Sequence, residues 1–448
     1  MPGRQSRRSV LAAITALPLT GALGACSGND SAASASSSSS RTGKTTITFW
    51  SALRGSQEVV DKFNQTHDHI QVDYQQVPSG TQGGYLKLSN AARAGNAPDV
   101  ATIEYPQLPG FAIDGVVRDI TELISDELRR KLLPQALGLT TFQSHTFSVP
   151  LDIEPMVMHY RKDLFDKYGF EVPTTWDEFA ELARKVRRRT GGGRKLTLFP
   201  TDGMTQFAAW ACQAGAQWFD TSHGAWNVSM ADAPTRKVAA YWQRLIDEEL
   251  VYTNASSARI ADAQIGTGLV LTRLSGAWDA GAQMNAHPEQ KGQWRIAPLP
   301  QWTPDKPSLG THGGSTFAVT KNSKKPEAAM EFIEWQVSHP DALKARLSSG
   351  ASSQYPAVSD LIPVGSKAFD KAYYGGQDIY RLFEEEAHKI RDGWVWGPRM
   401  TATGYVMQDA FARAGAGSGT LLSAARAAQD GTMPDLKALG LKTTTRST

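Results

Sequence analysis

The chain has 448 residues, 41% of them hydrophobic and 20% charged, which is enough for two or three domains with sizeable cores. It carries 47 Lys plus Arg against 44 Asp plus Glu, and the excess of three equals the early arginines Arg4, Arg7 and Arg8, so the body is neutral. A neutral body has no electrostatic footprint for nucleic acid and little attraction to anionic membranes, so neither is an expected partner.

Residues 1–25 have the pattern of an export signal. The three arginines precede an apolar run from Val10 to Ala25, which is too short to span a bilayer comfortably. The stretch Ser6-Arg7-Arg8-Ser9-Val10-Leu11 resembles a twin-arginine signal, which is typical of export in the folded state. The general export route stays open as the alternative.

The end of this run, Leu23-Gly24-Ala25-Cys26, resembles the bacterial lipobox, in which a lipid is attached to the cysteine and the chain is cut just before it. We expect Cys26 to be the lipidated first residue of the mature chain. Residues 26–45 are dominated by Ser, Ala and Gly, a composition that predicts a flexible tether. The sequence thus predicts a body anchored to the outer face of the cell membrane. The other cysteine is Cys212, so a disulfide framework and a cysteine zinc site are excluded.

The first part of the body alternates between strand and helix patterns. Period-two alternation predicts strands at 46–50, 70–74 and 99–103, and apolar residues at helical spacing predict helices at 59–63 and 85–94, the latter ended by Gly95. This order is typical of a parallel sheet with helices on its faces. Because ligands sit beyond the carboxyl ends of such strands, the first candidate site residues are Trp50, Ser51, Glu104 and Tyr105.

A second unit begins near Pro150. A strand at 156–160 and a helix at 162–168 precede Thr175-Trp176-Asp177-Glu178, a capping box that opens a helix with Trp176 in its core face. The basic end of that helix, residues 184–189, is assigned to solvent because cations favour helix C-termini. The later elements predicted are helices at 206–214, 234–249 and 326–338, strands at 269–274 and 317–319, and a mostly helical remainder to Leu439.

Several short motifs, none specific by itself, occur in a recognisable order along the body. They are Ile47–Trp50, Ala92–Val100, Val149–Pro150, Tyr160–Phe165, Pro173–Phe179, Gly276–Trp278, Phe317–Lys321 and Ala328–Ile333. In this order they resemble the family 1 extracellular solute-binding proteins, the sugar-capturing components of ATP-driven importers.

The resemblance implies an α/β fold of the two-lobed, periplasmic-binding-protein-like kind (type II), with a helix-flanked sheet in each lobe and a ligand cleft at the hinge. It divides the chain into lobe 1 (46–154 plus 285–345), lobe 2 (155–284 plus 346–440) and a tail (441–448). Closure of the lobes around a ligand is the expected transition. The resemblance also implies a monomer without a cofactor that delivers a small saccharide to the permease subunits of an ABC importer.

A saccharide site needs flat aromatic platforms and fixed hydrogen-bonding groups, because sugars present apolar C–H faces edged by hydroxyls. Four of the 12 tryptophans lie at the ends of predicted elements, and Trp210 is a weaker candidate within a helix. Gly313 and Gly314 allow a ligand to approach the backbone closely. The four tryptophans at element ends are Trp50, Trp278, Trp394 and Trp396.

Two other functions stay open. Arg399 would bind a carboxylate or phosphate if it faced the cleft, favouring a glycerophosphodiester or another anionic or peptide ligand, although a structural ion pair is the preferred interpretation. A surface-anchored carbohydrate-active enzyme is the second alternative, since distant carboxylates could meet in a cleft. The nucleophile-elbow, phosphate-loop and dinucleotide motifs are absent, and His67 and His69 have no third ligand in the sequence pattern, so no metal is expected.

Overall fold

A computed structural model describes residues 43–221 and 224–445 of the chain. The predicted export signal, Cys26 and nearly all of the predicted tether lie outside the described residues. The folded unit begins at Lys44.

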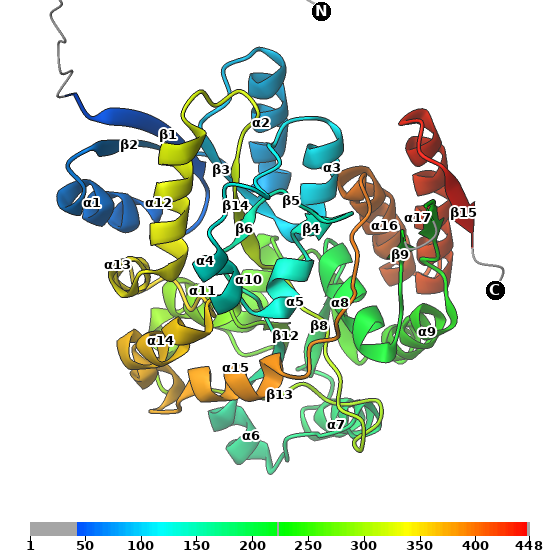
Figure 1. The fold of residues 1–448 in the computed structure, drawn as a ribbon. Coiled ribbons are helices and arrows are strands. Elements are labelled where there is room, and N and C mark those ends of the chain that lie inside the picture. The colour runs from blue at the N-terminus through cyan, green and yellow to red at the C-terminus, as the bar shows by residue number, and fades with distance from the viewer. Residues whose placement is uncertain (1–42, 222–223, 446–448) are drawn as a thin grey trace, which may run out of the picture. The chain divides into compact units, whose positions relative to one another are not determined.

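A five-stranded sheet organises the first lobe (Figure 1). Its strand order is β2 (Ile70–Gln76), β1 (Thr45–Ser51), β3 (Val100–Glu104), β14 (Ser315–Val319) and β6 (Val149–Pro150). β1 runs parallel to both β2 and β3, which confirms the predicted parallel unit. β14 comes from far along the chain and is antiparallel to β3 and β6, so the complete sheet is mixed.

The predicted helices cover this sheet. α1 (Ser56–Thr66) buries Val59, Val60 and Phe63, and α2 (Gly84–Arg93) is followed by Gly95 with φ 74°, the left-handed conformation expected after a helix. α12 (Pro326–Ser338) lies beside β1 and has the bounds predicted from sequence. Its Phe332 ring meets Phe63 at 5.0 Å between centroids, which joins the two helices through the core.

A three-stranded antiparallel sheet organises the second lobe. β7 (Met156–Arg161) is its central strand, between β12 (Thr272–Gly276) and β13 (Trp294–Pro298). α6 (Lys162–Tyr168) and α7 (Trp176–Arg189) follow, and both halves of the predicted capping box, Thr175 and Glu178, are present. A parallel pair, β8 (Thr197–Pro200) and β11 (Val251–Asn254), continues this lobe.

The basic end of α7 is tied to neighbouring acids. Arg184 donates to both carboxylate oxygens of Glu248 at 2.6 and 2.7 Å and to Glu181 at 2.5 Å. These pairs agree with the assignment of this end to a structural, solvent-facing role.

Helices form the rest of the second lobe, as predicted for the C-terminal part. α8 (Met204–Ala214) packs against α9 (Ala233–Asp247), and α16 (Met400–Gly415) and α17 (Leu421–Ala438) lie side by side (Figure 1). The smaller helices of the whole fold are α3 (Leu108–Ile113), α4 (Asp126–Lys131), α5 (Pro134–Gly138), α10 (Arg259–Gly266), α11 (Asp279–Ala286), α13 (Pro340–Ser348), α14 (Ile362–Ala368) and α15 (Ile379–Ala387). The short strands of the whole fold are β4 (Thr141–Phe142), β5 (His145–Thr146), β9 (Phe219–Asp220) and β10 (Trp226–Val228).

Two predicted boundaries differ from the structure. β13 lies in the range assigned to lobe 1 but pairs with β7, so it belongs to the second sheet. Within the predicted tail, β15 (Thr443–Thr445) pairs in parallel with β10. Both pairings join segments distant in sequence, and a short strand carries no local mark of its partner.

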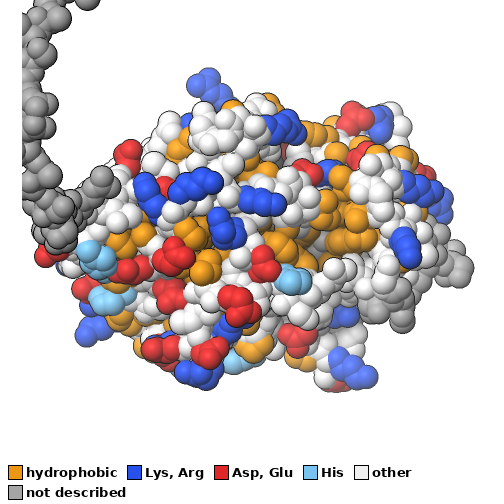
Figure 2. Space-filling view, turned by 45° about the horizontal axis from the view of Figure 1, so that its top comes forward, with side chains coloured by type: hydrophobic (Ala, Val, Ile, Leu, Met, Phe, Trp, Pro, Cys, Tyr) orange, Lys and Arg blue, Asp and Glu red, His pale blue; other side chains and the backbone are white. Residues whose placement is uncertain are grey.

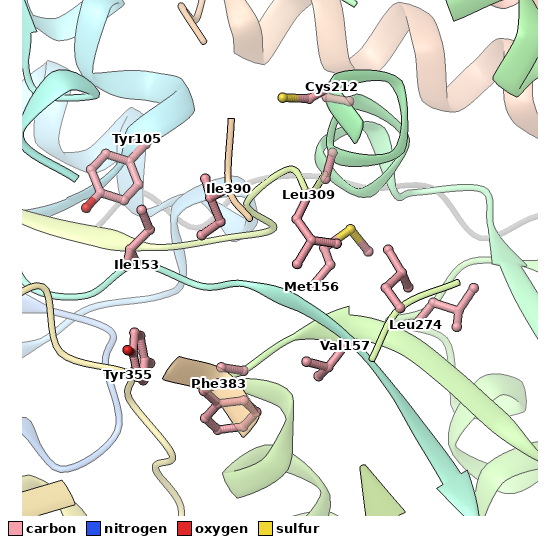
Figure 3. Packing of buried hydrophobic residues seen from close by; sticks show 14 of the residues in the cluster. Tyr105, Ile153, Met156, Val157, Cys212, Leu274, Leu309, Tyr355, Phe383 and Ile390 are labelled. Atoms are coloured by element: carbon pink, nitrogen blue, oxygen red, sulfur yellow. The ribbon is translucent and has the colours of Figure 1, made fainter. Parts of the chain in front are cut away.

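The chain passes between the two sheets through residues 151–155, which join β6 to β7, and residues 299–314, which join β13 to β14. We call these the crossing segments. Figure 3 shows Ile153 and Leu309 from them together with Ile390, and Leu309 forms a parallel bridge with Ile390. Apolar packing therefore continues from one lobe to the other along the crossing segments.

Within the described residues, we find no helix with the length and apolar character needed to cross a bilayer. Acidic and basic side chains both occur across the face drawn in Figure 2.

Candidate functional site

A cleft of about 680 Å³ lies beyond the carboxyl ends of β1 and β3. Trp50, Tyr85 and Glu104 contribute to its wall from the first lobe, and Arg273 and Trp278 from the second. The crossing segments form its floor. The cleft thus lies where the order of strands predicts a ligand.

Two tryptophans face this cleft from different lobes. Trp50 is half-buried, and the Lys87 Nζ lies 4.2 Å from the centre of its ring. Trp278 is also half-buried; its Nε1 donates to the His312 carbonyl at 2.9 Å and its backbone N donates to Glu154 Oε2 at 2.7 Å. These bonds fix the Trp278 ring in place, so it is a rigid platform.

Gly313 and Gly314 line the cleft on the second crossing segment. Their φ angles of 90° and 99° lie in the left-handed region, and a Cβ on Gly313 would stand 2.8 Å from Trp278 Nε1. A Cβ on Gly314 would stand 2.4 Å from the Tyr105 ring. Backbone conformation and close packing both require glycine here.

Glu104, on the open wall of the cleft, accepts a hydrogen bond from the Tyr85 hydroxyl at 2.8 Å. The phenol therefore orients one oxygen of this carboxylate. Tyr85 was not among the candidates because it begins a predicted helix; its side chain reaches the cleft because α2 starts at the cleft wall.

Three predicted site residues are buried away from the cleft, so their assignment is wrong. The Ser51 hydroxyl accepts from Leu53 N at 3.0 Å, and the Tyr105 hydroxyl donates to the Asp152 carbonyl at 2.6 Å, so each braces the backbone beside the cleft. Trp210 is fully buried and stacks on Trp242 with 4.2 Å between ring centroids. Side chains alternate in direction along an extended strand end, which separates Trp50 from Ser51 and Glu104 from Tyr105.

The remaining candidates also lie elsewhere. Trp394 and Trp396 border a second cavity rather than the cleft. The Arg399 guanidinium donates to both oxygens of Asp114 at 2.9 and 2.8 Å, so its assignment as a ligand-binding residue is wrong and the ion pair is the correct interpretation.

Two acids on the first crossing segment are functional candidates that the sequence argument missed. Asp152 Oδ1 accepts from Ser315 N at 2.6 Å, and burial raises the pKa of Asp152 to about 7. The pKa of Glu154 is raised well above its usual value, first by burial and then by the neighbouring Asp152. Both acids interrupt an apolar stretch from Val149 to Met156, and that unusual placement was the available signal.

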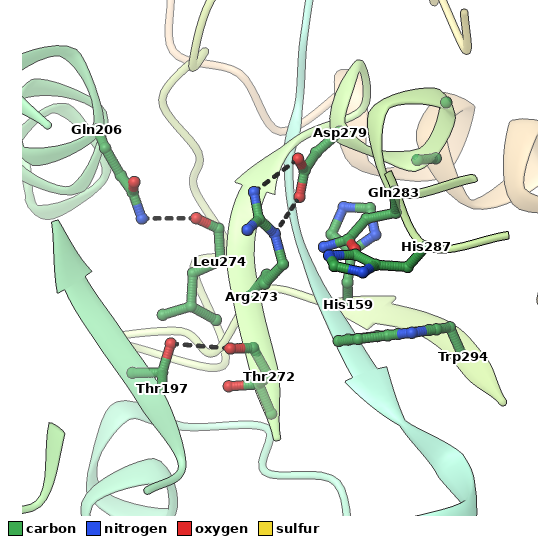
Figure 4. A network of polar contacts seen from close by, with 12 residues as sticks. His159, Thr197, Gln206, Thr272, Arg273, Leu274, Asp279, Gln283, His287 and Trp294 are labelled. Carbon is green, nitrogen blue, oxygen red and sulfur yellow. Dashed lines mark hydrogen bonds and ion pairs between the residues drawn. The ribbon is translucent and has the colours of Figure 1, made fainter. Parts of the chain in front are cut away.

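Arginines balance these acids. Arg346 is 2% exposed, and burial lowers its pKa to about 10, with Asp152 acting in the opposite sense. Arg273 donates to both oxygens of Asp279 at 2.7 and 2.8 Å (Figure 4). Because Arg273 and Asp279 neutralise each other, their side of the cleft suits an uncharged guest.

Hydrogen bonds from the surroundings hold the strand that carries Arg273. Gln206 Nε2 donates to the Leu274 carbonyl at 2.6 Å, and Thr197 Oγ1 donates to the Thr272 carbonyl at 3.1 Å (Figure 4). His159 lies on the neighbouring strand, and burial lowers its pKa to about 4, so this histidine is neutral beside the ion pair.

Several polar atoms of the cleft lining are buried and find no hydrogen-bond partner within the described chain. They are Thr102 Oγ1, Glu154 Oε1, His312 Nδ1 and Gln354 Oε1. Buried polar groups are normally satisfied, and these atoms are shielded from the empty cleft, so a ligand hydroxyl would reach them only after the lining moves. Over residues 43–221 and 224–445 no group of His, Cys, Asp and Glu side chains is arranged to hold a metal ion.

Comparison with known proteins agrees with this geometry. The family model for bacterial extracellular solute-binding proteins matches residues 51–342, and the chain belongs to this family. The arabinooligosaccharide-binding protein of Halalkalibacterium halodurans is 24% identical over 306 residues, which cover 66% of this chain and 64% of that protein. The match thus spans less than two thirds of that relative's length.

Two solved structures resemble nearly the whole body. The galacto-N-biose/lacto-N-biose I-binding protein of an ABC transporter from Bifidobacterium longum superposes with a TM-score of 0.80 and 26% identity, covering 90% of this chain and 99% of that one. An ABC transporter associated binding protein from B. animalis subsp. lactis Bl-04, solved with β-1,6-galactobiose, gives 0.79 and 27%, covering 90% and 100%. The predicted two-lobed α/β fold is thereby confirmed.

Proposed function

We propose that the protein is the substrate-binding component of an ABC importer and captures a small neutral saccharide in the cleft between its lobes. The single observation that carries this proposal is the pair of tryptophans, Trp50 and Trp278, presented to one cleft from two lobes. Their rings accept the C–H faces of a sugar, while polar side chains exposed in the lining, such as Glu104, bind its hydroxyls.

The partners follow from the same role. The protein delivers its sugar to the permease subunits of the importer. Cys26 carries the lipid that anchors the protein to the outer face of the cell membrane. The family to which the chain belongs is an extracellular one, and the relatives named above bind oligosaccharides, which supports this role. We propose that the protein acts as a monomer.

The protein is a receptor rather than a glycosidase. Glycosidase carboxylates flank the scissile bond with roughly 5 Å or more between them. Asp152 and Glu154 instead lie two residues apart on one crossing segment, so this pair lines a single side of the cleft.

Isothermal calorimetry with a panel of arabino-, galacto- and malto-oligosaccharides tests the proposal. We expect one neutral sugar class to bind with a stoichiometry of one and to be recovered unchanged. New reducing ends after incubation would establish the enzyme alternative instead. Binding of a glycerophosphodiester or a peptide in place of every sugar would establish the anionic or peptide alternative.

A further inference from the structure

The residues around Trp278 belong to the second lobe but contact more than that lobe. β12 ends at Gly276 and α11 begins at Asp279, and the residues at this junction present the Trp278 ring to the cleft. We call residues 276–281 the platform turn. Asp279 accepts from Arg273 and thereby holds the turn to its own sheet (Figure 4). Further hydrogen bonds lead from the turn to the chains that join the two lobes.

Besides the two crossing segments, a third stretch of chain joins the lobes. Residues 349–361 lead from α13, which packs against α1 of the first lobe, to α14, which packs against α15. α15 in turn packs against β13 of the second lobe. The stretch runs beside the first crossing segment, where Ile153 N donates to the Tyr355 carbonyl at 3.1 Å. We call residues 349–361 the third connection.

Both crossing segments bond to Trp278. Its backbone N donates to Glu154 Oε2 at 2.7 Å on the first segment, and its Nε1 donates to the His312 carbonyl at 2.9 Å on the second. His312 N donates in turn to the Glu154 carbonyl at 3.0 Å, so the three residues close a ring of hydrogen bonds. A Cβ on Gly276 would collide with the His312 carbonyl oxygen, so this approach requires glycine. The indole therefore has a fixed orientation relative to both crossing segments.

The third connection bonds to the platform turn on either side of the indole. Ser353 Oγ donates to the Ala277 carbonyl at 2.7 Å and accepts from Gly281 N at 2.8 Å. A Cβ on Gly281 would stand 2.5 Å from the Ser352 carbonyl carbon, so glycine is required here as well. The platform turn is thus hydrogen-bonded to each of the three chains that join the lobes.

Glu154 and Ser353 lie behind the platform turn rather than on its cleft surface. They are 0% and 1% exposed, whereas Trp278 is half-buried with its ring at the cleft. A guest in the cleft therefore meets the ring and not these two side chains. Any contribution of Glu154 and Ser353 to binding passes through the ring that they hold.

We propose that the platform turn couples sugar binding to the angle between the lobes, with Glu154 and Ser353 as positioning residues of Trp278. Because the turn is bonded to all three connecting chains, a change in the lobe angle changes the position of the ring. A ligand shifts a conformational equilibrium only by its different affinity for the two states, and a ring whose position depends on the lobe angle supplies such a difference. This coupling rests on the proposed function, because its guest is the sugar.

The orientation of Trp278 is measured first, by nuclear magnetic resonance of the sugar-free full chain. Trp278→Phe assigns the Trp278 indole N–H signal. We expect Ser353→Ala to shift this signal and to speed its exchange with water about 10-fold, the factor that corresponds to one lost hydrogen bond, and to leave the Trp226 signal in place. An unmoved Trp278 signal with unchanged exchange would overturn the positioning role of Ser353, whichever sugar the protein binds.

Two variants of Glu154 test the other bond. Glu154→Gln keeps an oxygen for Trp278 N, so we expect the indole signal of the unmodified protein. Glu154→Leu removes the acceptor, so we expect the changes seen in Ser353→Ala, which carries the test alone if Glu154→Leu does not fold. The same indole signal in Glu154→Leu as in the unmodified protein would contradict the role of Glu154.

Thr403→Val is the matched control. The hydroxyls of Thr403 and Thr432 share a buried hydrogen bond of 2.7 Å between α16 and α17, outside the platform turn. This variant loses a buried hydroxyl as Ser353→Ala does, and we expect it to leave the Trp278 signal and the sugar Kd unchanged. Equal changes in Thr403→Val and Ser353→Ala would show a general loss of stability and overturn the positioning role.

The coupling itself is measured with the sugar identified by calorimetry. We expect Ser353→Ala to weaken sugar binding about 10-fold, as for one lost hydrogen bond. Small-angle X-ray scattering then follows closure as a fall in the radius of gyration at saturating sugar. In Ser353→Ala we expect this fall to be less than about half of that in the unmodified protein, because sugar on a loosened ring discriminates less between the open and closed states.

Equal falls in the two proteins at saturation would overturn the coupling, because a residue that only stabilises the fold would change the sugar Kd and leave closure complete. Failure of every sugar to bind the unmodified protein would instead contradict the proposed function. The resonance result on the sugar-free chain would still decide whether Ser353 and Glu154 position Trp278.

Discussion

The cleft and the second cavity, which Thr311, Trp394 and Trp396 line, both border the crossing segments, yet their linings differ in chemistry. The cleft combines aromatic rings with acids and arginines, whereas the second cavity has mostly apolar walls that include the rings of Trp394 and Trp396. One alternating stretch, with Thr311 on one side and His312 on the other, supplies both. The comparison shows that neighbouring residues of one crossing segment can line two cavities of different chemistry.

The ion pair on the cleft wall gives the largest expected effect. Arg273→Met leaves Asp279, which is 1% exposed, as an uncompensated buried charge, so we expect a loss of about 3–5 kcal/mol in the free energy of unfolding. Arg381→Ala, which breaks an exposed pair with Glu385, should cost less than about 1 kcal/mol. Denaturant titration compares them, and equal losses would contradict the view that the cleft charges are matched internally.

The aromatic platform Trp278 gives the next largest expected effect. Trp278→Ala removes a fixed ring from the cleft, and we expect sugar binding to weaken by about 2–4 kcal/mol, as for a binding hot spot. Trp226→Ala changes a half-buried tryptophan of β10 outside the cleft and should leave the sugar Kd unchanged. Calorimetry measures both, and an unaltered Kd in Trp278→Ala would remove this residue from the site.

The acids of the first crossing segment make stability depend on pH. The pKa of Asp152 rises from 3.8 to about 7 on folding, so the folded state holds the proton more tightly and its stability falls as pH rises from about 4 to about 7. One such proton contributes a slope of at most about 1.4 kcal/mol per pH unit. Arg346 opposes the shift and Glu104 reinforces it.

Asp152→Asn keeps an acceptor for Ser315 N and removes the titration. We expect its free energy of unfolding to fall less between pH 4 and pH 7 than that of the unmodified protein. Parallel pH profiles for the two proteins would show that Asp152 does not hold a proton near neutrality.

Two buried indoles sharpen the comparison between satisfied and unsatisfied donors. Trp176 Nε1 donates to Gln213 Oε1 at 3.0 Å. Trp176→Phe leaves this buried acceptor without a donor, so we expect the free energy of unfolding to fall by about 1–3 kcal/mol beyond any packing change. Trp394→Phe removes a donor that has no acceptor in the described residues, so we expect it to cost less. Thermal denaturation of the two variants measures the difference, and the reverse order would contradict it.

Arg399 gives the smallest expected effect. Its pair with Asp114 is partly exposed, so Arg399→Ala should reduce stability by about 1 kcal/mol or less and leave the sugar Kd unchanged. Loss of sugar binding in this variant would show that Arg399 contributes to ligand binding after all.

Local patterns in the sequence predicted most of the elements. α6 and α12 have the predicted bounds, and the capping box at Thr175 and Glu178 is present, because helices are specified by apolar spacing and end groups within the segment itself. The positions beyond β1 and β3 were also predicted, which placed Trp50 and Glu104 at the cleft. Arg399 shows the limit, since the sequence offered both an ion pair and a ligand contact, and Asp114 is 285 residues away.

The sequence by itself thus determined the class of fold, the family and the edge of the sheet at which a ligand is expected. Only the tertiary structure decided that Trp210 belongs to the core, that Trp394 borders the second cavity and that β13 joins the second sheet. The physical reason is range: helix spacing and caps act within a few residues, whereas the partner of a short strand and the direction of an isolated tryptophan depend on segments that meet only after folding.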